Sequence, residues 1–393
     1  MIRPFSYLLA AALLAPLPAL SARALDAPHR TTAHATVAQG IAFLRSIQQA
    51  DGSWSPQPGP AVTGLVVALL LDEPDIGPDD PAVARGVSYL LDRVQSDGSI
   101  RDGADGILAN YNTAICLSAL TRLPGHPQAA AAVQGAQRFL INLQWKDGMT
   151  LPSGEVITAD HPFYGGAGYG QHGRPDMSNT QIMLQGLYDA GLDCDDPAFQ
   201  RALTFISRCQ GIPQNTYFAP GTLENKGGVI YATAINGKHP HIPVSYANPQ
   251  AVDEARAGQS VSGLRGYGSM TYAAFKSFVY ANLAANDPRV VAAQLWIETH
   301  YTLDQNPGLP EAFGSQGLYY YYLTHARALS AWGQTHLNIP GQKPLDWANA
   351  LIDQLASQQQ PDGSFVNSEP RWMEDDAALV TAYALTALQH AAP

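Results

Sequence analysis

The segment at residues 48–54 reads QQADGSW, and related segments return as VQSDGSI at 94–100, QWKDGMT at 144–150 and QQPDGSF at 359–365. They follow stretches whose apolar residues are spaced as on one face of a helix, for example PAVARGVSYLLDRVQ at 81–95. Glycine readily takes the left-handed backbone conformation in which many helices end. The repeated Asp-Gly pairs therefore predict the ends of a series of similar helices.

The starts of helices are marked as well. Three Asp-Pro pairs, at 80–81, 196–197 and 287–288, precede amphipathic stretches, and aspartate and proline both suit a helix start. A second kind of helix, such as TGLVVALL or TAYALTAL, is apolar nearly all round and is therefore expected to be buried. These helices are expected to start at six threonines: Thr63, Thr113, Thr180, Thr271, Thr324 and Thr381.

The pattern amounts to six repeats of an outer amphipathic helix followed by an inner buried helix. Helical repeats that share a buried face stack on their neighbours, and six repeats that close on themselves leave no exposed end. We therefore expect an all-α (α/α)6 toroid, formed by one domain over 30–392, with long loops at 148–177 and 211–268. We allow for a small β-hairpin within 211–268. The outer helices are expected near 36–49, 81–95, 128–144, 197–210, 287–303 and 345–359.

The glutamine and the aromatic residue that recur in these segments have a structural interpretation. A glutamine near the last turn can bond free helix carbonyls or the neighbouring repeat. An aromatic residue such as Trp54 or Phe365 can wedge between repeats. We expect these residues to stabilise the ring rather than to take part in catalysis.

The first 24 residues read as a signal peptide. Arg3 precedes an apolar run that ends in Ala22-Arg23-Ala24, and Pro16 and Pro18 break that run, which is too short for a membrane-spanning helix. We expect an exported protein, periplasmic or extracellular. The net charge of −11 becomes −13 once Arg3 and Arg23 are removed, which argues against nucleic acid and anionic membranes as partners.

Three cysteines are present in the chain. Cys116 lies in the apolar segment YNTAICLSAL and is expected to be buried as a free thiol. Cys194 and Cys209 flank a predicted helix, and a disulfide between them stays open at this point.

The segment QGIAFLRSIQQADGSW at 39–54 resembles the repeat of squalene cyclases and related triterpene cyclases. Weaker copies are RGVSYLLDRVQSDGS, QGAQRFLINLQWKDG and ALTFISRCQ. Protein prenyltransferase β-subunits share the same ring, and the chain looks most similar to exported bacterial prenyltransferase and squalene-oxidase repeat proteins. The resemblance implies a terpenoid-cyclase-like protein that binds or converts an uncharged isoprenoid or lipid in the central cavity.

The resemblance also suggests a set of acidic residues. Cyclases that protonate an alkene carry Asp-x-Asp-Asp, and this chain has Trp372 followed by Met373-Glu374-Asp375-Asp376. By that match Asp375 would be the acid, with Asp376 as its partner and Glu374 beside them. Capping of a helix start is the alternative, because carboxylates are favoured there by the helix dipole.

In such a ring the inner helices run parallel, so their first turns gather at one mouth. Tyrosine rings at this mouth could stabilise a carbocation or stack on a sugar. The candidate substrate-binding residues are Trp372, Tyr111, Asn112, Asn179, Asp176, His172, Tyr272, Tyr319, Tyr322 and Tyr383. Consecutive helical tyrosines point in different directions, so only one or two of the four at 319–322 can face the hollow.

No cofactor or metal is expected. The zinc site of protein prenyltransferases needs Asp-x-Cys and a histidine, whereas this chain has Tyr267-Gly268-Ser269 and Leu323 at the resembling places, and His325 should face away from Leu323. Histidines of the two long loops, namely His161, His172, His239 and His241, could form another site, but their spacing matches no strict motif. Two other function classes stay open: a carbohydrate-active lyase or glycosidase, and a non-catalytic binding or scaffold ring.

Overall fold

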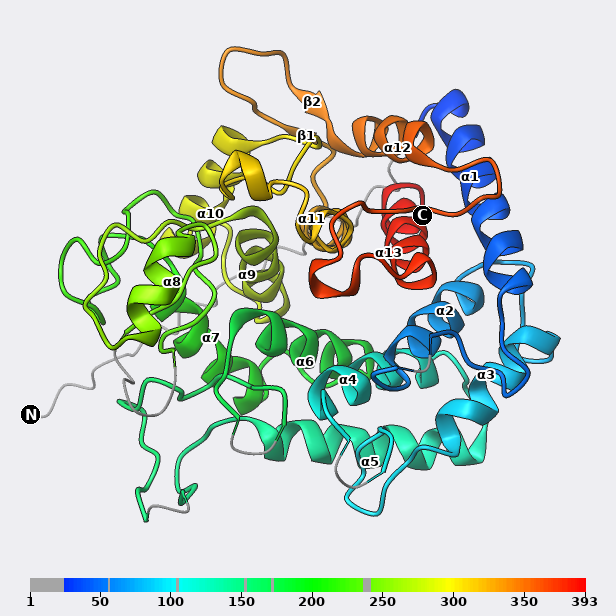
Figure 1. The fold of residues 1–393 in the computed structure, drawn as a ribbon, viewed down its shortest axis with the longest axis horizontal. Coiled ribbons are helices and arrows are strands. Elements are labelled where there is room, and N and C mark those ends of the chain that lie inside the picture. Colours follow the sequence, from blue (N-terminus) through cyan, green and yellow to red (C-terminus); the bar gives the residue numbers. More distant parts are fainter. Residues whose placement is uncertain (1–24, 56, 104–105, 152–153, 171–172, 236–241) are drawn as a thin grey trace, which may run out of the picture.

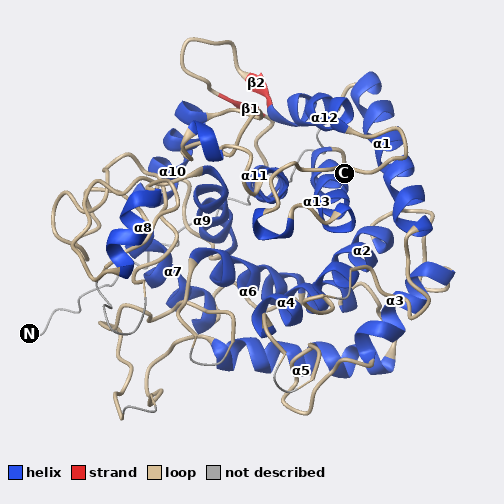
Figure 2. Ribbon diagram, viewed as in Figure 1, coloured by secondary structure: helices blue, strands red, loops and turns tan. Residues whose placement is uncertain are grey.

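The computed structural model describes residues 25–393 except 56, 104–105, 152–153, 171–172 and 236–241. Within this part of the chain the helices form a closed double ring (Figure 1), and strands contribute only a small two-stranded sheet (Figure 2). The predicted (α/α)6 toroid is confirmed. The predicted signal peptide lies outside the described residues.

The inner ring consists of six helices, each packed against the next. Contacts run from α2 to α4, α6, α9, α11 and α13, and from α13 back to α2, which closes the ring. These helices are α2 (Ala61–Leu71), α4 (Ala109–Leu120), α6 (Met177–Asp189), α9 (Gly268–Tyr280), α11 (Leu318–Trp332) and α13 (Ala377–Ala391). Their side chains are buried on nearly every face, as the sequence predicts for a helix that packs on all sides.

The outer ring also has six helices. They are α1 (Ala27–Ser46), α3 (Pro81–Leu91), α5 (Pro127–Leu143), α7 (Pro197–Cys209), α10 (Pro288–His300) and α12 (Trp347–Gln358). Asp80, Asp196 and Asp287 accept backbone N–H bonds at the starts of α3, α7 and α10, as expected for capping residues. Helix α1 begins earlier than the sequence pattern suggests, because Asp26 caps it.

A glutamine that follows an outer helix joins one repeat to the next. The Gln48 Nε2 donates to the carbonyl of Gly52 at 3.0 Å and to that of Ala82, in α3, at 2.9 Å. Three further glutamines make the same pair of bonds: Gln144 to Gly165 and Ala198, Gln210 to Gly227 and Arg289, and Gln359 to Gly363 and Thr36. The last of these ties α12 to α1 across the closure of the ring.

The glycine in each of these pairs lies against the backbone of the next outer helix. Gly363 has φ +89°, and a Cβ there would stand 2.3 Å from the Gln39 carbonyl oxygen. Gly52 and Gly165 are equally close to α3 and α7. Gly148, in the Asp-Gly pair at 147–148, has a positive φ as expected but faces open space, because an inserted loop moves the packing position on to Gly165.

Five of the six predicted threonines bind the segments that enter the inner helices, but all six lie two to six residues inside their helices rather than at the start, and Thr324 donates to the Tyr321 carbonyl within α11. Thr63 accepts a bond from the Trp54 amide at 3.0 Å, and Thr381 accepts one from the Phe365 amide at 3.0 Å. Thr113, Thr180 and Thr271 do the same with the amides of Ile100, Ala167 and Val229. Trp54 is buried, and its indole N–H donates to the Leu44 carbonyl, so the predicted wedge is confirmed.

The small β-hairpin that the sequence allowed within 211–268 is not formed in the described part of that loop. Within the described part of 211–268 the chain forms helix α8 (Pro249–Arg256) and isolated bridges such as Ala232 with Val244, rather than a hairpin of named strands. The two-stranded sheet, β1 (His336–Leu337) and β2 (Leu345–Asp346), lies between α11 and α12. Two short 3₁₀ turns, η1 (Glu311–Phe313) and η2 (Arg371–Met373), precede α11 and α13.

The cysteines and the lengths of the helices bear on two of the expectations from the sequence. Cys116 is buried as expected, and Cys194 and Cys209 are free thiols, so the disulfide left open above is not formed. None of the helices in the described part of the chain is long and apolar enough to cross a membrane.

We predict that Gly363→Ala destabilises the ring far more than Gly148→Ala, although both glycines stand in Asp-Gly pairs with positive φ. Alanine at either position should cost roughly 1–2 kcal/mol in backbone strain. At 363 the Cβ also collides with α1, which should add about 1–3 kcal/mol. Urea unfolding followed by circular dichroism measures both changes. Equal losses for the two variants would contradict a packing role for Gly363.

Candidate functional site

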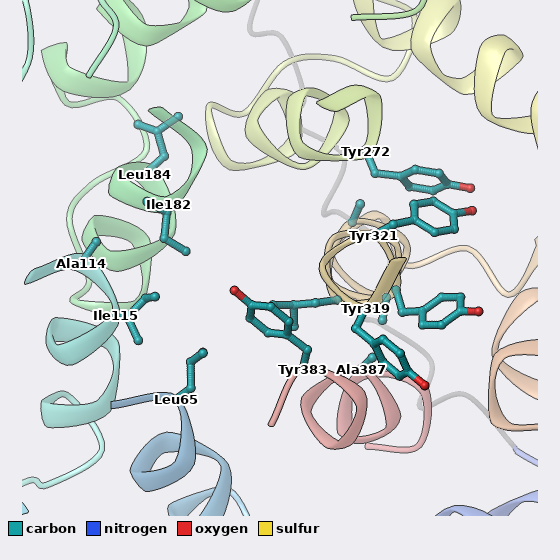
Figure 3. Close-up of a cluster of buried hydrophobic side chains, with 14 of the residues drawn as sticks. Leu65, Ala114, Ile115, Ile182, Leu184, Tyr272, Tyr319, Tyr321, Tyr383 and Ala387 are labelled. Atoms are coloured by element: carbon teal, nitrogen blue, oxygen red, sulfur yellow. The ribbon is translucent and has the colours of Figure 1, made fainter. Parts of the chain in front are cut away.

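A cavity of about 240 Å³ lies at the end of the ring where the inner helices begin. Every inner helix contributes to its wall, including Leu65 from α2, Ile115 from α4 and Tyr383 from α13. Figure 3 shows these three side chains directed into the space between the helices. The remaining helical positions of the wall are Ala61, Val62, Tyr111, Asn112, Ser178, Ser269, Met270, Tyr320 and Leu379.

Loops complete the wall and form its lip. They supply Pro58, Gly59, Leu108, Tyr169, Tyr231, Tyr267, Gly317, Trp372 and Met373. Trp372 is 40% exposed and packs edge-on against Tyr246 at 5.6 Å between ring centroids. Tyr111 stacks on Tyr169 at 6.0 Å. The described residues of the wall carry aliphatic, aromatic, hydroxyl and amide groups, and none of them is charged.

A chain of hydrogen bonds leads from the cavity wall into the interior of the ring. The hydroxyls of Tyr111 and Ser178 are hydrogen-bonded, and Ser178 Oγ lies 2.8 Å from the Tyr320 hydroxyl. Gln181 Nε2 donates to the Tyr320 hydroxyl at 2.6 Å. Lys276 Nζ donates to Gln181 Oε1 at 2.7 Å. Four inner helices, α4, α6, α9 and α11, are thus joined by polar contacts.

Lys276 is the deepest member of this chain. It is fully buried in α9, and its second acceptor is Gln185 Oε1 at 2.7 Å, so both hydrogen-bond partners are neutral amides. Burial lowers the pKa of Lys276 well below its ordinary value, and the nearby Arg327 lowers it further. Burial likewise raises the pKa of Tyr320 to about 12, so this phenol stays protonated at neutral pH.

Sequence analysis missed Gln181 and Lys276. A signal was present, because the segment TYAAFKSF places one lysine in a helix that is otherwise apolar. A lysine that is buried in a helix interior must find hydrogen-bond acceptors on a neighbouring element. The sequence alone cannot say that α6 supplies them.

Asp176 and Asn179 lie just behind the cavity wall and organise the start of α6. Asp176 is fully buried and accepts bonds from the Asn179 amide at 2.8 Å and from its side chain at 3.0 Å. Burial raises the pKa of Asp176, whereas Arg174 opposes the shift. Asn112 does line the cavity, and its Oδ1 accepts from the Ala61 amide, which joins α4 to α2.

The three predicted catalytic carboxyls do not line the cavity. Trp372 and Met373 both have a positive φ, and the turn they form leads Glu374 away from the cavity to the start of α11. There Glu374 accepts bonds from the amides of Tyr319 and Tyr320 at 3.2 and 2.8 Å. Asp376 caps α13, and Asp375 is exposed. The capping alternative therefore describes this geometry better than the acid role implied by the resemblance.

Three of the predicted tyrosines also need correction. The hydroxyl of Tyr322 donates to the Leu303 carbonyl and that of Tyr319 to Gln358, so both face the outer ring. Tyr272 packs against Tyr321 on the side of α9 and α11 that faces away from the central space, as Figure 3 shows. Successive helical residues differ by about 100° in direction, so Tyr320 is the member of its run that reaches the cavity.

The histidines contribute no site within the described residues. His161 stacks on Trp145 at 5.5 Å between ring centroids, and His325 is buried beside Trp347, away from the cavity as expected. His172, His239 and His241 lie outside the described residues. Among the residues whose placement is described, no group of three or more His, Cys, Asp or Glu is arranged to hold a metal ion.

No protein-family profile matches the sequence, and no curated protein matches it. Solved structures with a similar course of the chain include a glycosidase in complex with glucose, at 11% identity and a TM-score of 0.49, covering 93% of this chain and 98% of that one. Another is a type II terpene cyclase from Scytonema in complex with geranylgeranyl dihydroxybenzoate, at 13% identity, a TM-score of 0.33 and coverage of 94% and 99%. A glycosyl hydrolase of family 88 from Bacteroides vulgatus has 11% identity, a TM-score of 0.47 and coverage of 91% and 99%.

Glu374 should make stability depend on pH. Burial raises its pKa from 4.5 to about 7 in the folded protein, against the opposing effect of its hydrogen-bond donors. The folded state therefore holds this proton more tightly than the unfolded chain, so stability should fall as pH rises from about 4.5 to 7 and level off above. This component is at most about 3.5 kcal/mol, at about 1.4 kcal/mol for each pKa unit.

The measurement compares urea unfolding of wild type and Glu374→Gln between pH 5 and 8. The variant should lack this component of the pH dependence, while Asp375→Asn, at the exposed neighbouring position, should keep the wild-type slope. The same slope in all three proteins would show that Glu374 is not the titrating group.

Proposed function

We propose that the protein binds an uncharged, predominantly apolar small molecule of the isoprenoid or lipid class in the cavity at the mouth of the inner ring. The observation that supports this most is the wall itself, whose described residues come from all six inner helices and include no charged side chain. Apolar contact favours such a ligand at roughly 25 cal/mol for each Å² removed from water.

The absence of charge in the described wall argues against ionic ligands. A diphosphate or carboxylate buried there would lose its hydration without gaining a cationic partner. The cavity volume of about 240 Å³ is slightly below the usual range of roughly 300–1,000 Å³ for small-molecule sites, which favours a short ligand.

The composition of the cavity wall also argues against a glycosidase and against an alkene-protonating cyclase. Glycosidases place two carboxyl groups on either side of the bond that they cleave, and no described wall residue is a carboxylic acid. Protonation of an alkene likewise needs an acid in contact with the substrate. The proposal is therefore one of binding, and it assigns no turnover to the cavity.

Filling the cavity should abolish binding. Ala61 lines the cavity from the first turn of α2, and Ala68 is seven residues further along the same helix, half-buried like Ala61 but outside the wall. We predict that Ala61→Phe weakens binding of farnesol at least about tenfold by occupying the space, whereas Ala68→Phe leaves it unchanged. Isothermal titration calorimetry measures both affinities.

A second measurement identifies the ligand that co-purifies with the protein. Native mass spectrometry of the freshly purified chain should show an uncharged apolar ligand that Ala61→Phe loses. A wild-type protein that binds neither farnesol nor any co-purified apolar molecule, or one that binds a sugar instead, would overturn the proposal.

A further inference from the structure

The hydrogen bonds behind the cavity have a fixed direction. Gln185 Nε2 donates to the Asp189 carboxylate at 2.8 Å, so its Oε1 faces Lys276 and accepts from it. Lys276 also donates to Gln181 Oε1, which leaves the amide nitrogen of Gln181 to donate to the Tyr320 hydroxyl. Both the ammonium form of lysine, with three N–H groups, and the neutral amine, with two, can donate these two hydrogen bonds. The direction is therefore independent of the charge of Lys276.

This direction leaves one surplus hydrogen at the cavity. Tyr111, Ser178 and Tyr320, the hydroxyl triad, all line the cavity and carry three O–H hydrogens. Two hydrogen bonds join the three groups through Ser178 and use two of these hydrogens, whichever group donates in each bond. The third hydrogen has only the weaker approach of the Tyr111 and Tyr320 hydroxyls to each other within the triad. Gln181 supplies its own hydrogen to Tyr320, so it uses none from the triad. One O–H is therefore available to a ligand whose oxygen is a better-placed acceptor than the second tyrosine hydroxyl.

We propose that the hydroxyl triad donates a hydrogen bond to the ligand, and that the natural ligand carries an acceptor oxygen, as in an ether, ketone, ester or alcohol, at the end that meets Tyr111 and Ser178. This inference rests on the binding function proposed above and specifies the polar end of the ligand. The specificity-determining residues are those of the triad, and Gln181 and Lys276 are positioning residues that act through Tyr320.

The physical basis of the discrimination is the cost of an unmade bond. A hydrocarbon in the cavity would leave the surplus O–H without an acceptor, whereas an oxygen-bearing ligand of the same shape would accept it. A hydrogen bond of this kind contributes about 0.5–1.5 kcal/mol, which corresponds to about 2- to 12-fold in affinity.

The test uses three probes with one hydrocarbon chain: farnesene, farnesyl methyl ether and farnesol. The ether can only accept a hydrogen bond, the alcohol can accept or donate, and the hydrocarbon can do neither. Wild type should bind the ether and the alcohol about 2- to 12-fold more tightly than farnesene. Equal affinities for all three probes would overturn the inference but leave the binding function intact. Failure of all three to bind, together with no co-purified apolar ligand in the wild-type protein, would overturn the binding function itself.

The decisive variant is Gln181→Glu, which reverses the direction of the chain. A carboxylate at 181 can accept from both Lys276 and Tyr320, so the Tyr320 hydrogen is withdrawn from the triad and no surplus O–H remains. The ether should then fall to the affinity of farnesene, whereas farnesol, which can donate, should remain the tighter ligand. An unchanged preference for the ether in the folded variant would overturn the inference.

The test includes a matched control at another glutamine and a second variant that removes the hydroxyls directly. Gln354 donates to the Tyr322 hydroxyl at 3.4 Å outside the cavity, so Gln354→Glu places the same change beside a tyrosine that no ligand reaches and should keep the wild-type preference. If Gln181→Glu does not fold, the combination of Tyr111→Phe, Ser178→Ala and Tyr320→Phe removes all three hydroxyls with little change of shape. The ether and farnesene should then bind equally, and a persisting preference would overturn the inference.

Discussion

The closure of the ring depends on one contact, repeated between outer helices: a glutamine side chain bonded to two carbonyls beside a glycine without room for a Cβ. The bonds of Gln48 and Gln359 show the arrangement at α3 and at the α12–α1 closure. Four such contacts fix α1 on α3, α5 on α7, α7 on α10 and α12 on α1, and the packing of each inner helix on the next completes the ring, so the inner helices start at the same end. The cavity exists because these starts meet there.

The acidic residues near that end serve the helix starts rather than the cavity. Asp176 and Asp376 bind the first amides of α6 and α13, and Glu374 crosses to those of α11. A helix start favours negative charge, so each carboxyl is drawn to the backbone and not into the central space. This arrangement explains how a strongly acidic protein keeps the described wall of its cavity free of charge.

Buried polar side chains orient a hydroxyl group in the wall of an otherwise apolar cavity. Lys276 is buried among neutral amides, and its two hydrogen bonds orient Gln181, which in turn orients the Tyr320 hydroxyl. A buried polar group that lacked such partners would cost several kcal/mol, so the chain of bonds is also a condition for the lysine to be tolerated. Packing and ligand preference thus depend on the same side chains.

The sequence by itself determined the order of the six outer and six inner helices, because periodicity, Asp-Pro starts and the Asp-Gly turns that follow outer helices are local signals that each segment carries alone. Helix α8 was not among them. It also indicated Tyr111, Asn112, Trp372 and Tyr383 as cavity residues, from their places in the inner helices or in the segment before one of them. It could not decide which carboxyl serves a neighbouring helix, as Glu374 does, or that Tyr320 faces inward where Tyr319 does not. Those choices depend on rotations of helices that are far apart in the chain, and only the packed ring sets them.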